Sequence, residues 1–182
     1  MPPPQMLNLH SSSGNSQIDK ALIAELKRIA SVFPINPGFK YIEDPSPNAF
    51  AVRNNIVPGT QGTVYIGLNL IAGEFNGSEF GGVAVAGICA HECGHILQFQ
   101  TNYDRILASA TAQLIELHAD FFAGFYLGRS KAHSKEHVGI FARSLVSRGD
   151  YDYNSQTHHG TPQQRVRAMS QGYDGSIKRQ SV

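Results

Sequence analysis

One stretch of the sequence constrains the fold more than any other, because it is apolar around nearly the whole circumference of a helix. Residues 83–100 read VAVAGICAHECGHILQFQ, with small or apolar side chains at almost every position. A helix that is apolar all round is buried, so we expect this one to run through the centre of the domain. Even so, it carries His91, Glu92 and His95.

The spacing of these three residues predicts a metal site. A helix turns about 100° per residue, so His91 and His95 project from one face, one turn apart. Two imidazoles so placed can bind one Zn²⁺ at roughly 2.0–2.1 Å each. Glu92 is rotated off this axis, which suits a base for a bound water better than a ligand. The alternative is a metal-free buried helix, but burying these groups without partners would be costly.

A catalytic zinc needs a third protein ligand as well as an open position. The downstream segment LIELHADFFAGF (114–125) places Glu116 and Asp120 four residues apart on one helix face. This phase predicts Glu116 as the third ligand and Asp120 as an acceptor for a histidine N–H. His118, about 200° away from Glu116 on the helix, is the alternative third ligand.

These motifs resemble those of known metallopeptidases. The pair HECGH and ELHAD resembles the HExxH…ExxxD pattern of the Glu-zincins, in particular two families. One contains the prenyl-protein (CAAX) zinc endopeptidases and the bacterial heat-shock zinc protease, and the other is the bacterial neutral zinc metallopeptidase family. PNAFAV (47–52) with VYIGLNLI resembles the first family's strand signature, and HHGTPQQRV (158–166) resembles the C-terminal pattern of both. The resemblance spans roughly residues 47 to 168.

The sequence departs from both families at identifiable points. The first family has several transmembrane helices, and this chain has none. Gly160 stands where that family usually has proline, and Phe121 stands where the neutral family often has cysteine.

The resemblance implies a zinc-dependent metalloendopeptidase with one Zn²⁺ per chain. His91, His95 and Glu116 would bind the metal, Glu92 would act as general base, and Asp120 would orient a ligand.

The resemblance also implies roles for residues outside these motifs. His159 would help to hold the tetrahedral oxyanion, and Arg165 would brace the site through a carboxylate such as Asp120. Asn48 would lie near the substrate. The residues alone leave other interpretations open. His158 and His159 could both be exposed loop histidines, Arg165 a surface charge and Asn48 a turn residue. The sequence also does not decide whether His158 or His159 faces the site.

The remaining pattern predicts an α+β fold, a zincin-like metallopeptidase domain that is mostly helical with a small three-stranded sheet. We expect strands over 39–44, 46–54 and 63–71, of which the second or third would offer an edge to an extended substrate. A loop follows over 73–82. The expected helices cover 16–33 (capping box Ser16–Asp19), 83–100, 104–127 (opened by Asp104, stopped by Gly128), 134–149 and 162–169 (capping box Thr161–Gln164).

The length of 182 residues fits a single domain. We assign 1–15 to a flexible N-terminal arm, 16–175 to the metallopeptidase domain and 176–182 to a flexible, solvated tail. Cys89 and Cys93, four residues apart on one helix, are poorly placed for a disulfide and are expected to be buried free thiols.

Composition excludes several classes of partner. The net charge is +1 and only 16% of residues are charged, so nothing indicates nucleic-acid binding. No apolar run reaches the length of about 18 residues of a transmembrane helix, and the first residues lack the features of a signal peptide. The expectation from these features is a cytoplasmic protein that acts on a peptide or protein substrate.

The function that these features predict is hydrolysis of peptide bonds by a zinc-activated water, with Glu92 as general base. The alternative is a zinc-binding, non-catalytic interaction or chaperone-like module. Substrate sequence, regulation and oligomeric state stay open.

Overall fold

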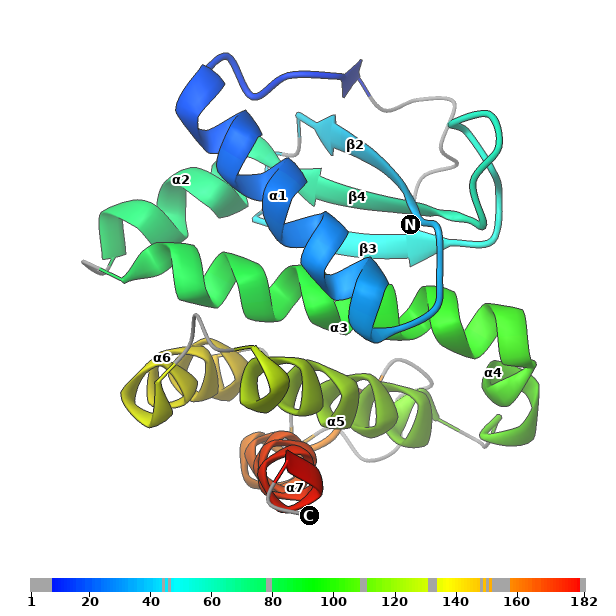
Figure 1. The fold of residues 1–182 in the computed structure, drawn as a ribbon, viewed down its shortest axis with the longest axis vertical. Coiled ribbons are helices and arrows are strands. Elements are labelled where there is room, and N and C mark those ends of the chain that lie inside the picture. The colour runs from blue at the N-terminus through cyan, green and yellow to red at the C-terminus, as the bar shows by residue number, and fades with distance from the viewer. Residues whose placement is uncertain are drawn as a thin grey trace.

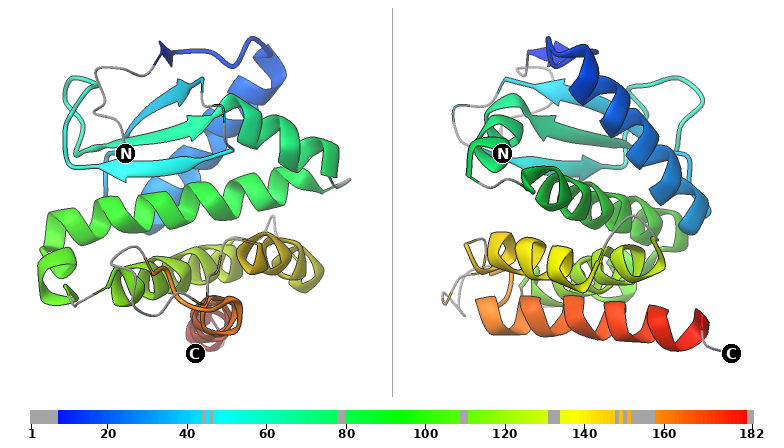
Figure 2. Two further views of the ribbon diagram at one scale, coloured as in Figure 1. Left: turned by 180° about the vertical axis from the view of Figure 1, so that it is seen from behind. Right: turned by 60° about the vertical axis from the view of Figure 1, so that its left-hand side comes forward.

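The computed structural model describes residues 8–43, 45, 47–77, 80–108, 111–130, 134–147, 149, 151 and 158–180. The domain contains a small sheet, with helices α1 (Ser16–Val32) and α3 (Gly81–Thr101) packed against it (Figures 1 and 2). A further layer of helices covers the other side of α3. That further layer contains α5 (Gln113–Arg129) and α6 (Lys135–Val146), with α7 (Pro162–Gln180) outermost. The predicted α+β class, with helix predominating, is therefore confirmed.

Helix α3 is the central element, as its sequence predicts. Every residue from Val83 to Ile96 is buried. The helix contacts the sheet on one side and α5 and α6 on the other. This position puts the HECGH segment between the two halves of the domain.

The sheet has four strands in the order β1-β2-β4-β3 among the described residues, where three were expected. The added strand, β1 (Leu9–His10), pairs antiparallel with β2 (Gly38–Ile42). Strand β2 runs parallel to β4 (Thr63–Gly67), and β4 pairs antiparallel with β3 (Ala49–Val52). Strand β4 is buried and has a neighbour on each side, so it is not an edge strand. Of the two strands predicted to offer an edge, it is β3 that lies at one edge of the sheet.

The third predicted strand is too long, because the chain changes to helix within it. Strand β4 ends at Gly67, and α2 spans Leu68–Gly77, which also replaces the first half of the predicted 73–82 loop. Leu70 and Ile71 are buried in the core, and α2 packs on α3 and β4. A short apolar run fits strand or helix equally well from sequence, and here tertiary packing selects the helix.

The predicted 104–127 helix is two helices. Helix α3 ends at Thr101, and the next residue, Asn102, caps it in a left-handed conformation (φ 58°). The short α4 (Tyr103–Ile106) follows, and α5 begins at Gln113. Asp104 does not cap a long helix; its carboxylate pairs with Arg53, from the segment that follows β3.

Of the two predicted capping boxes, the one at the start of α1 is wrong and the one at the start of α7 is confirmed. The cap of α1 is Asn15, whose side chain accepts from the N–H groups of Gln17 and Ile18. Asp19, expected to complete a box with Ser16, instead accepts from Ser12 and Ser13. The box that opens α7 is confirmed, since Thr161 and Gln164 exchange side-chain-to-backbone hydrogen bonds.

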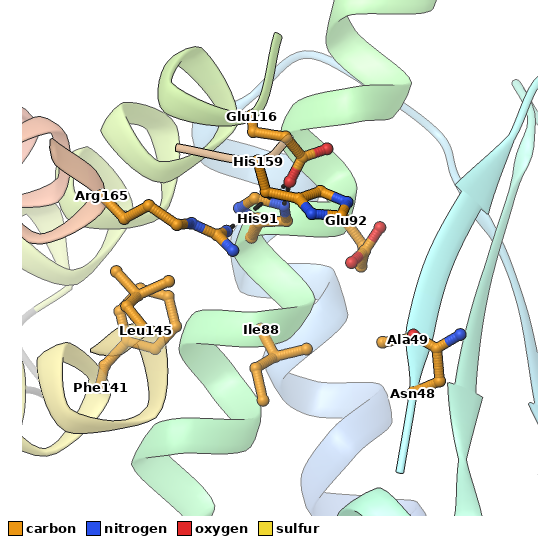
Figure 3. Close-up of a pocket in the computed structure, with 10 residues that line it drawn as sticks. All are labelled: Asn48, Ala49, Ile88, His91, Glu92, Glu116, Phe141, Leu145, His159 and Arg165. Carbon is orange, nitrogen blue, oxygen red and sulfur yellow. Dashed lines mark ion pairs between the residues drawn. The ribbon is translucent and has the colours of Figure 1, made fainter. Parts of the chain in front are cut away.

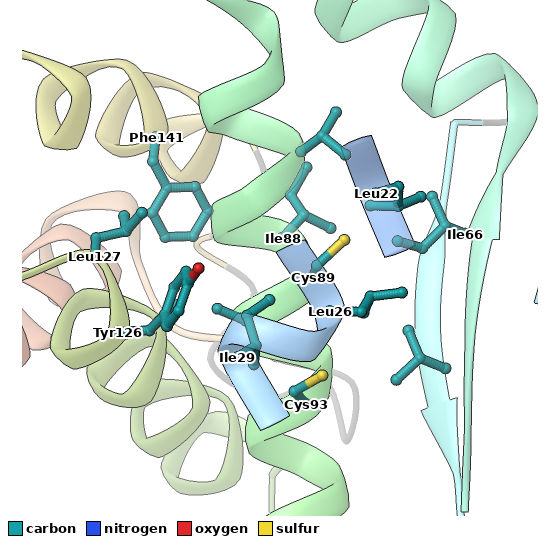
Figure 4. Packing of buried hydrophobic residues seen from close by; sticks show 14 of the residues in the cluster. Leu22, Leu26, Ile29, Ile66, Ile88, Cys89, Cys93, Tyr126, Leu127 and Phe141 are labelled. Carbon is teal, nitrogen blue, oxygen red and sulfur yellow. The ribbon is translucent and has the colours of Figure 1, made fainter. Parts of the chain in front are cut away.

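The core joins α1, the sheet and α3 on one side to α5 and α6 on the other (Figure 4). Cys89 and Cys93 lie within it as buried free thiols, as predicted, and burial raises the pKa of both. The Tyr126 hydroxyl donates to the buried Glu25 carboxylate at 2.6 Å and so connects α5 with α1.

Helix α7 is longer than predicted, and it packs on α5 through glycines. It continues to Gln180, and Ser176, assigned to the solvated tail, is fully buried. Gly128 does not end α5; it faces Tyr173 and Ser176 of α7. A side chain at Gly124 would overlap the carbonyl oxygen of Met169, so this glycine sets how closely the two helices approach.

We expect Gly124→Ala to destabilise the domain by at least about 1–3 kcal/mol, because the new methyl group collides with α7 backbone and not with a mobile side chain. Urea unfolding measures the change. Gly175→Ala is the matched control, since Gly175 lies in α7 with open space around its Cα. That substitution should be neutral or stabilise by up to about 1 kcal/mol. Equal stability of the Gly124 variant and wild type would contradict the close packing.

Residues 1–7 of the predicted arm and 181–182 of the predicted tail lie outside the described residues, as do 150 and 152–157 in the segment before His158. Within the arm, Leu9 and His10 are held in the sheet by β2. Among the helices that the structure describes, none has both the length and the apolar character needed to cross a bilayer.

Candidate metal centre

Three side chains from two helices converge on one point. The Nε2 atoms of His91 and His95 lie 3.1 Å apart on α3, and Glu116 reaches them from α5. One Glu116 oxygen lies 3.4 Å from His91 Nε2 and the other lies 3.4 Å from His95 Nε2. All three side chains are buried or nearly so. The cluster could hold a metal ion.

The crossing of α3 and α5 makes this convergence possible. Gly94, between the two histidines, faces α5 where a Cβ would lie 3.3 Å from both the Ala119 Cα and the Phe122 Cβ. A larger residue at this position would push the two helices apart. The glycine therefore allows His95 and Glu116 to approach each other.

Each imidazole has a fixed orientation, because its second nitrogen is hydrogen-bonded. His91 Nδ1 lies 2.9 Å from Asp120 Oδ1, and His95 Nδ1 lies 2.8 Å from Gln98 Oε1. Both partners are acceptors, so the neutral rings carry their protons on Nδ1. Both Nε2 lone pairs then point into the cluster, which is the tautomer that a metal ligand needs.

The donor set fits a tetrahedral metal ion. Two ligand atoms about 2.0–2.1 Å from such an ion lie about 3.3–3.4 Å apart, close to the 3.1–3.4 Å found here. The cluster also favours a positive charge at its centre. Burial alone would lower the pKa of His91, but the Asp120 and Glu116 carboxylates raise it to about 10. Burial raises the pKa of Glu116, yet the two histidines hold it well below its usual range.

Asp120 contacts the cluster through His91, and Arg165 in turn contacts Asp120. Asp120 is fully buried on α5, and Arg165 reaches it from α7 with Nε–Oδ2 and Nη2–Oδ1 distances of 2.8 and 2.9 Å. Burial raises the pKa of Asp120, but the bonds from His91 and Arg165 lower it below its usual value. Asp120 is thus a carboxylate that accepts from the His91 N–H, and Arg165 is not a surface residue.

Glu92 lies beside the cluster and not in it. Its side chain is directed toward the β3 side of His91 and lines a cavity of about 210 Å³ (Figure 3). Burial raises the pKa of Glu92, a shift that His91 and His95 partly oppose. The Glu92 carboxylate therefore lines the cavity beside the cluster, with a pKa above its ordinary value.

Two cavities meet at the cluster and together form a cleft along strand β3. The first continues to an apolar recess formed by Ile88, Phe141 and Leu145. The second, of about 380 Å³, runs the other way along β3 toward Phe99 and Ile115. Both are lined by the residues Asn48, Ala49, His91, Glu92, Glu116 and His159.

Asn48 precedes β3 at the cleft wall. Its carbonyl accepts from the Gly67 N–H at 2.8 Å, which anchors it to the end of β4. Asn48 thus lines both cavities beside the cluster, and its place near a substrate stays a prediction.

The structure separates the two adjacent histidines that the sequence could not rank. His159 lines both cavities, whereas His158 is buried and lies 3.3 Å from the Gln113 side chain. Between His159 and α7, Gly160 adopts φ 97°. Proline has φ near −65° and cannot adopt this conformation, which explains in physical terms why glycine stands here.

His118, the alternative third ligand, lies away from the cluster. Its ring packs on Phe122 and Tyr103, and its Nδ1 lies 3.3 Å from the Gln98 amide nitrogen. The helical phase argument placed Glu116 and Asp120 on one face, and the structure has both on the side of the histidines.

Sequence reasoning missed Gln98, the acceptor for His95. The available signal was its position, three residues after His95 on a helix face that should otherwise be apolar. A buried glutamine needs partners for both ends of its amide, and this need could have pointed to the neighbouring imidazole.

No protein-family model matches the chain, and no curated protein and no solved structure is significantly similar to it. The function must therefore be argued from the site itself.

Proposed function

We propose that this protein is a zinc-dependent metalloendopeptidase with a zincin-like fold. The observation that carries the proposal is the buried His91, His95 and Glu116 cluster, with the Glu92 carboxylate beside it on the wall of a cleft. A purely structural metal site would need neither a second carboxylate such as Glu92 beside the ligands nor a cleft.

The ligand set favours zinc over calcium and magnesium. Two imidazoles and one carboxylate are the protein ligands of one class of catalytic zinc sites, in which a water would take the remaining position. Calcium and magnesium prefer all-oxygen sites. Zinc held here would lower the pKa of a water toward about 7 and polarise a substrate carbonyl.

The surrounding residues would divide the acid–base and electrostatic work. Glu92 would accept the proton of the attacking water and return it to the leaving amine, a role that its raised pKa favours. His159 would donate a hydrogen bond to the oxyanion that forms on the carbonyl. Asp120, held by Arg165, keeps the His91 ring in position.

The edge strand supports a peptide substrate. Strand β3 lies at the sheet edge, and its residues Ala49, Phe50 and Ala51 line the cleft. An extended peptide could add to this edge through main-chain hydrogen bonds, with Asn48 at the end nearest the recess. The peptide bond to be cleaved would then lie beside His91, Glu92 and Glu116.

The resemblance to the Glu-zincin families supports the same function. The HExxH…ExxxD spacing, the segment before the motif and the histidine–arginine pair after it all bring residues to one cleft. The alternative, a zinc-binding interaction or chaperone-like module, explains the ligands but gives Glu92 no role.

A hydrolysis assay tests the proposal. Zinc-loaded protein should cleave casein or members of a quenched-fluorescence peptide library, a metal chelator should abolish cleavage, and added zinc should restore it. Protein that binds one zinc per chain but cleaves nothing in a broad library would support the non-catalytic alternative. Protein that binds no zinc would contradict both.

A further inference from the structure

We infer that Gln98 is a positioning residue of the metal centre, which fixes the tautomer of His95 and connects that ligand to the helix that carries Glu116. The inference rests on the proposed metal site and concerns a residue that neither HExxH nor ExxxD contains.

Gln98 uses both ends of its amide inside the protein. The side chain is fully buried. Its oxygen lies 2.8 Å from His95 Nδ1, and its nitrogen donates to the Ile115 carbonyl at 2.8 Å and lies 3.3 Å from His118 Nδ1. Because the backbone carbonyl can only accept, the amide nitrogen must face it, and the oxygen must face His95.

This arrangement sets the proton of His95. An amide oxygen can only accept, so the imidazole proton lies on Nδ1 and the lone pair on Nε2 points toward Glu116. In a histidine without such a partner, the proton would be distributed over Nδ1 and Nε2. Metal binding would then have to select the Nδ1-protonated tautomer, which would lower the affinity for the metal. Outer partners of this kind are typically worth 10–100-fold in metal affinity.

The second contact of Gln98 couples the two ligand helices. Ile115 directly precedes Glu116 on α5, whereas Gln98 lies one helical turn after His95 on α3. The same amide therefore holds the His95 ring and the first turn of α5 at a fixed separation. The two histidines differ in this respect: His91 has a charged partner, Asp120, and His95 has a neutral one.

Imidazole nitrogen NMR of the zinc-loaded wild-type protein is the first test, because it needs no variant. Both histidines should be bound through Nε2. The Nδ1 proton of His95 should be slow to exchange with water and should show contacts to the Gln98 side chain. Binding of zinc through Nδ1 of His95 would overturn the inference.

Two substitutions then separate positioning from simple packing. Gln98→Met keeps the length and removes the acceptor, so the His95 Nδ1 proton should exchange rapidly and the zinc dissociation constant should rise about 10–100-fold. Gln98→Glu restores an acceptor oxygen but, as a carboxylate, no longer donates to the Ile115 carbonyl, so the proton signal should return and the affinity should recover in part. The His91 Nδ1 proton, on Asp120, should persist in both.

Ile29→Val, a small core change on α1, controls for loss of stability and should leave both proton signals and zinc affinity unchanged. Gln98→Met with wild-type affinity and a protected His95 proton would overturn the inference while the metal site stands. Wild type without zinc would overturn the metal site and the inference together. Wild type with zinc but without peptidase activity would contradict only the proposed hydrolysis. If Gln98→Met does not fold, the wild-type spectrum and Gln98→Glu decide.

Discussion

Glu92→Gln should retain zinc and lose roughly 10²–10⁴-fold in peptide hydrolysis, the usual contribution of a general base. Glutamine matches glutamate in size and remains polar, so α3 should fold and both imidazoles should keep their positions. The amide cannot accept the proton of the attacking water. The raised pKa of Glu92, caused chiefly by burial, is one observation behind this expectation.

The experiment compares turnover and metal content in the same preparations. Glu136→Gln makes the same chemical change on an exposed face of α6 and should cleave as wild type does. Equal, chelator-sensitive turnover by Glu92→Gln and wild type would show that Glu92 is not the base. Loss of zinc in Glu92→Gln would instead make it part of the metal site.

Glu116→Ala should weaken zinc binding by more than the roughly 10–100-fold that outer partners contribute, because it removes a ligand outright. His118→Ala should leave the metal affinity close to wild type. The reason is geometric: the two oxygens of Glu116 each lie 3.4 Å from a histidine Nε2, whereas His118 packs among aromatic rings. Wild type should contain one zinc per chain and His95→Ala close to none.

Zinc retention under a competing chelator measures these differences. His118→Ala serves as the matched control, since it alters the same helix two residues from Glu116. If His118→Ala loses zinc and Glu116→Ala retains it, the assignment of the third ligand is wrong. Full zinc occupancy in His95→Ala would show that the metal lies elsewhere.

Local sequence patterns were sufficient for the residues that share a helix face. His91 and His95 lie one turn apart on α3, as do Glu116 and Asp120 on α5, and helical geometry alone predicts that each pair faces the same way. The apolar surroundings of the HECGH segment also predicted that α3 is buried at the centre. These relations depend on the backbone within one helix and need no knowledge of its neighbours.

The sequence was less informative where two structures satisfy the same pattern. The run after Gly67 became α2, because packing on α3 and β4 decides between strand and helix for a short apolar segment. Asp104 pairs with Arg53 and caps no long helix. Ser176, in the segment assigned to a solvated tail, is buried where α7 packs on Gly128 of α5.

The sequence by itself determined which side chains could form the metal centre, because ligand type and helical phase are local properties. Only the tertiary structure decided how they meet. In the folded chain His159, and not His158, lines the cleft. Arg165 of α7 contacts Asp120, and Gln98 contacts His95. These choices depend on how closely the helices pack at Gly94 and Gly124, and such distances arise between elements far apart in the chain.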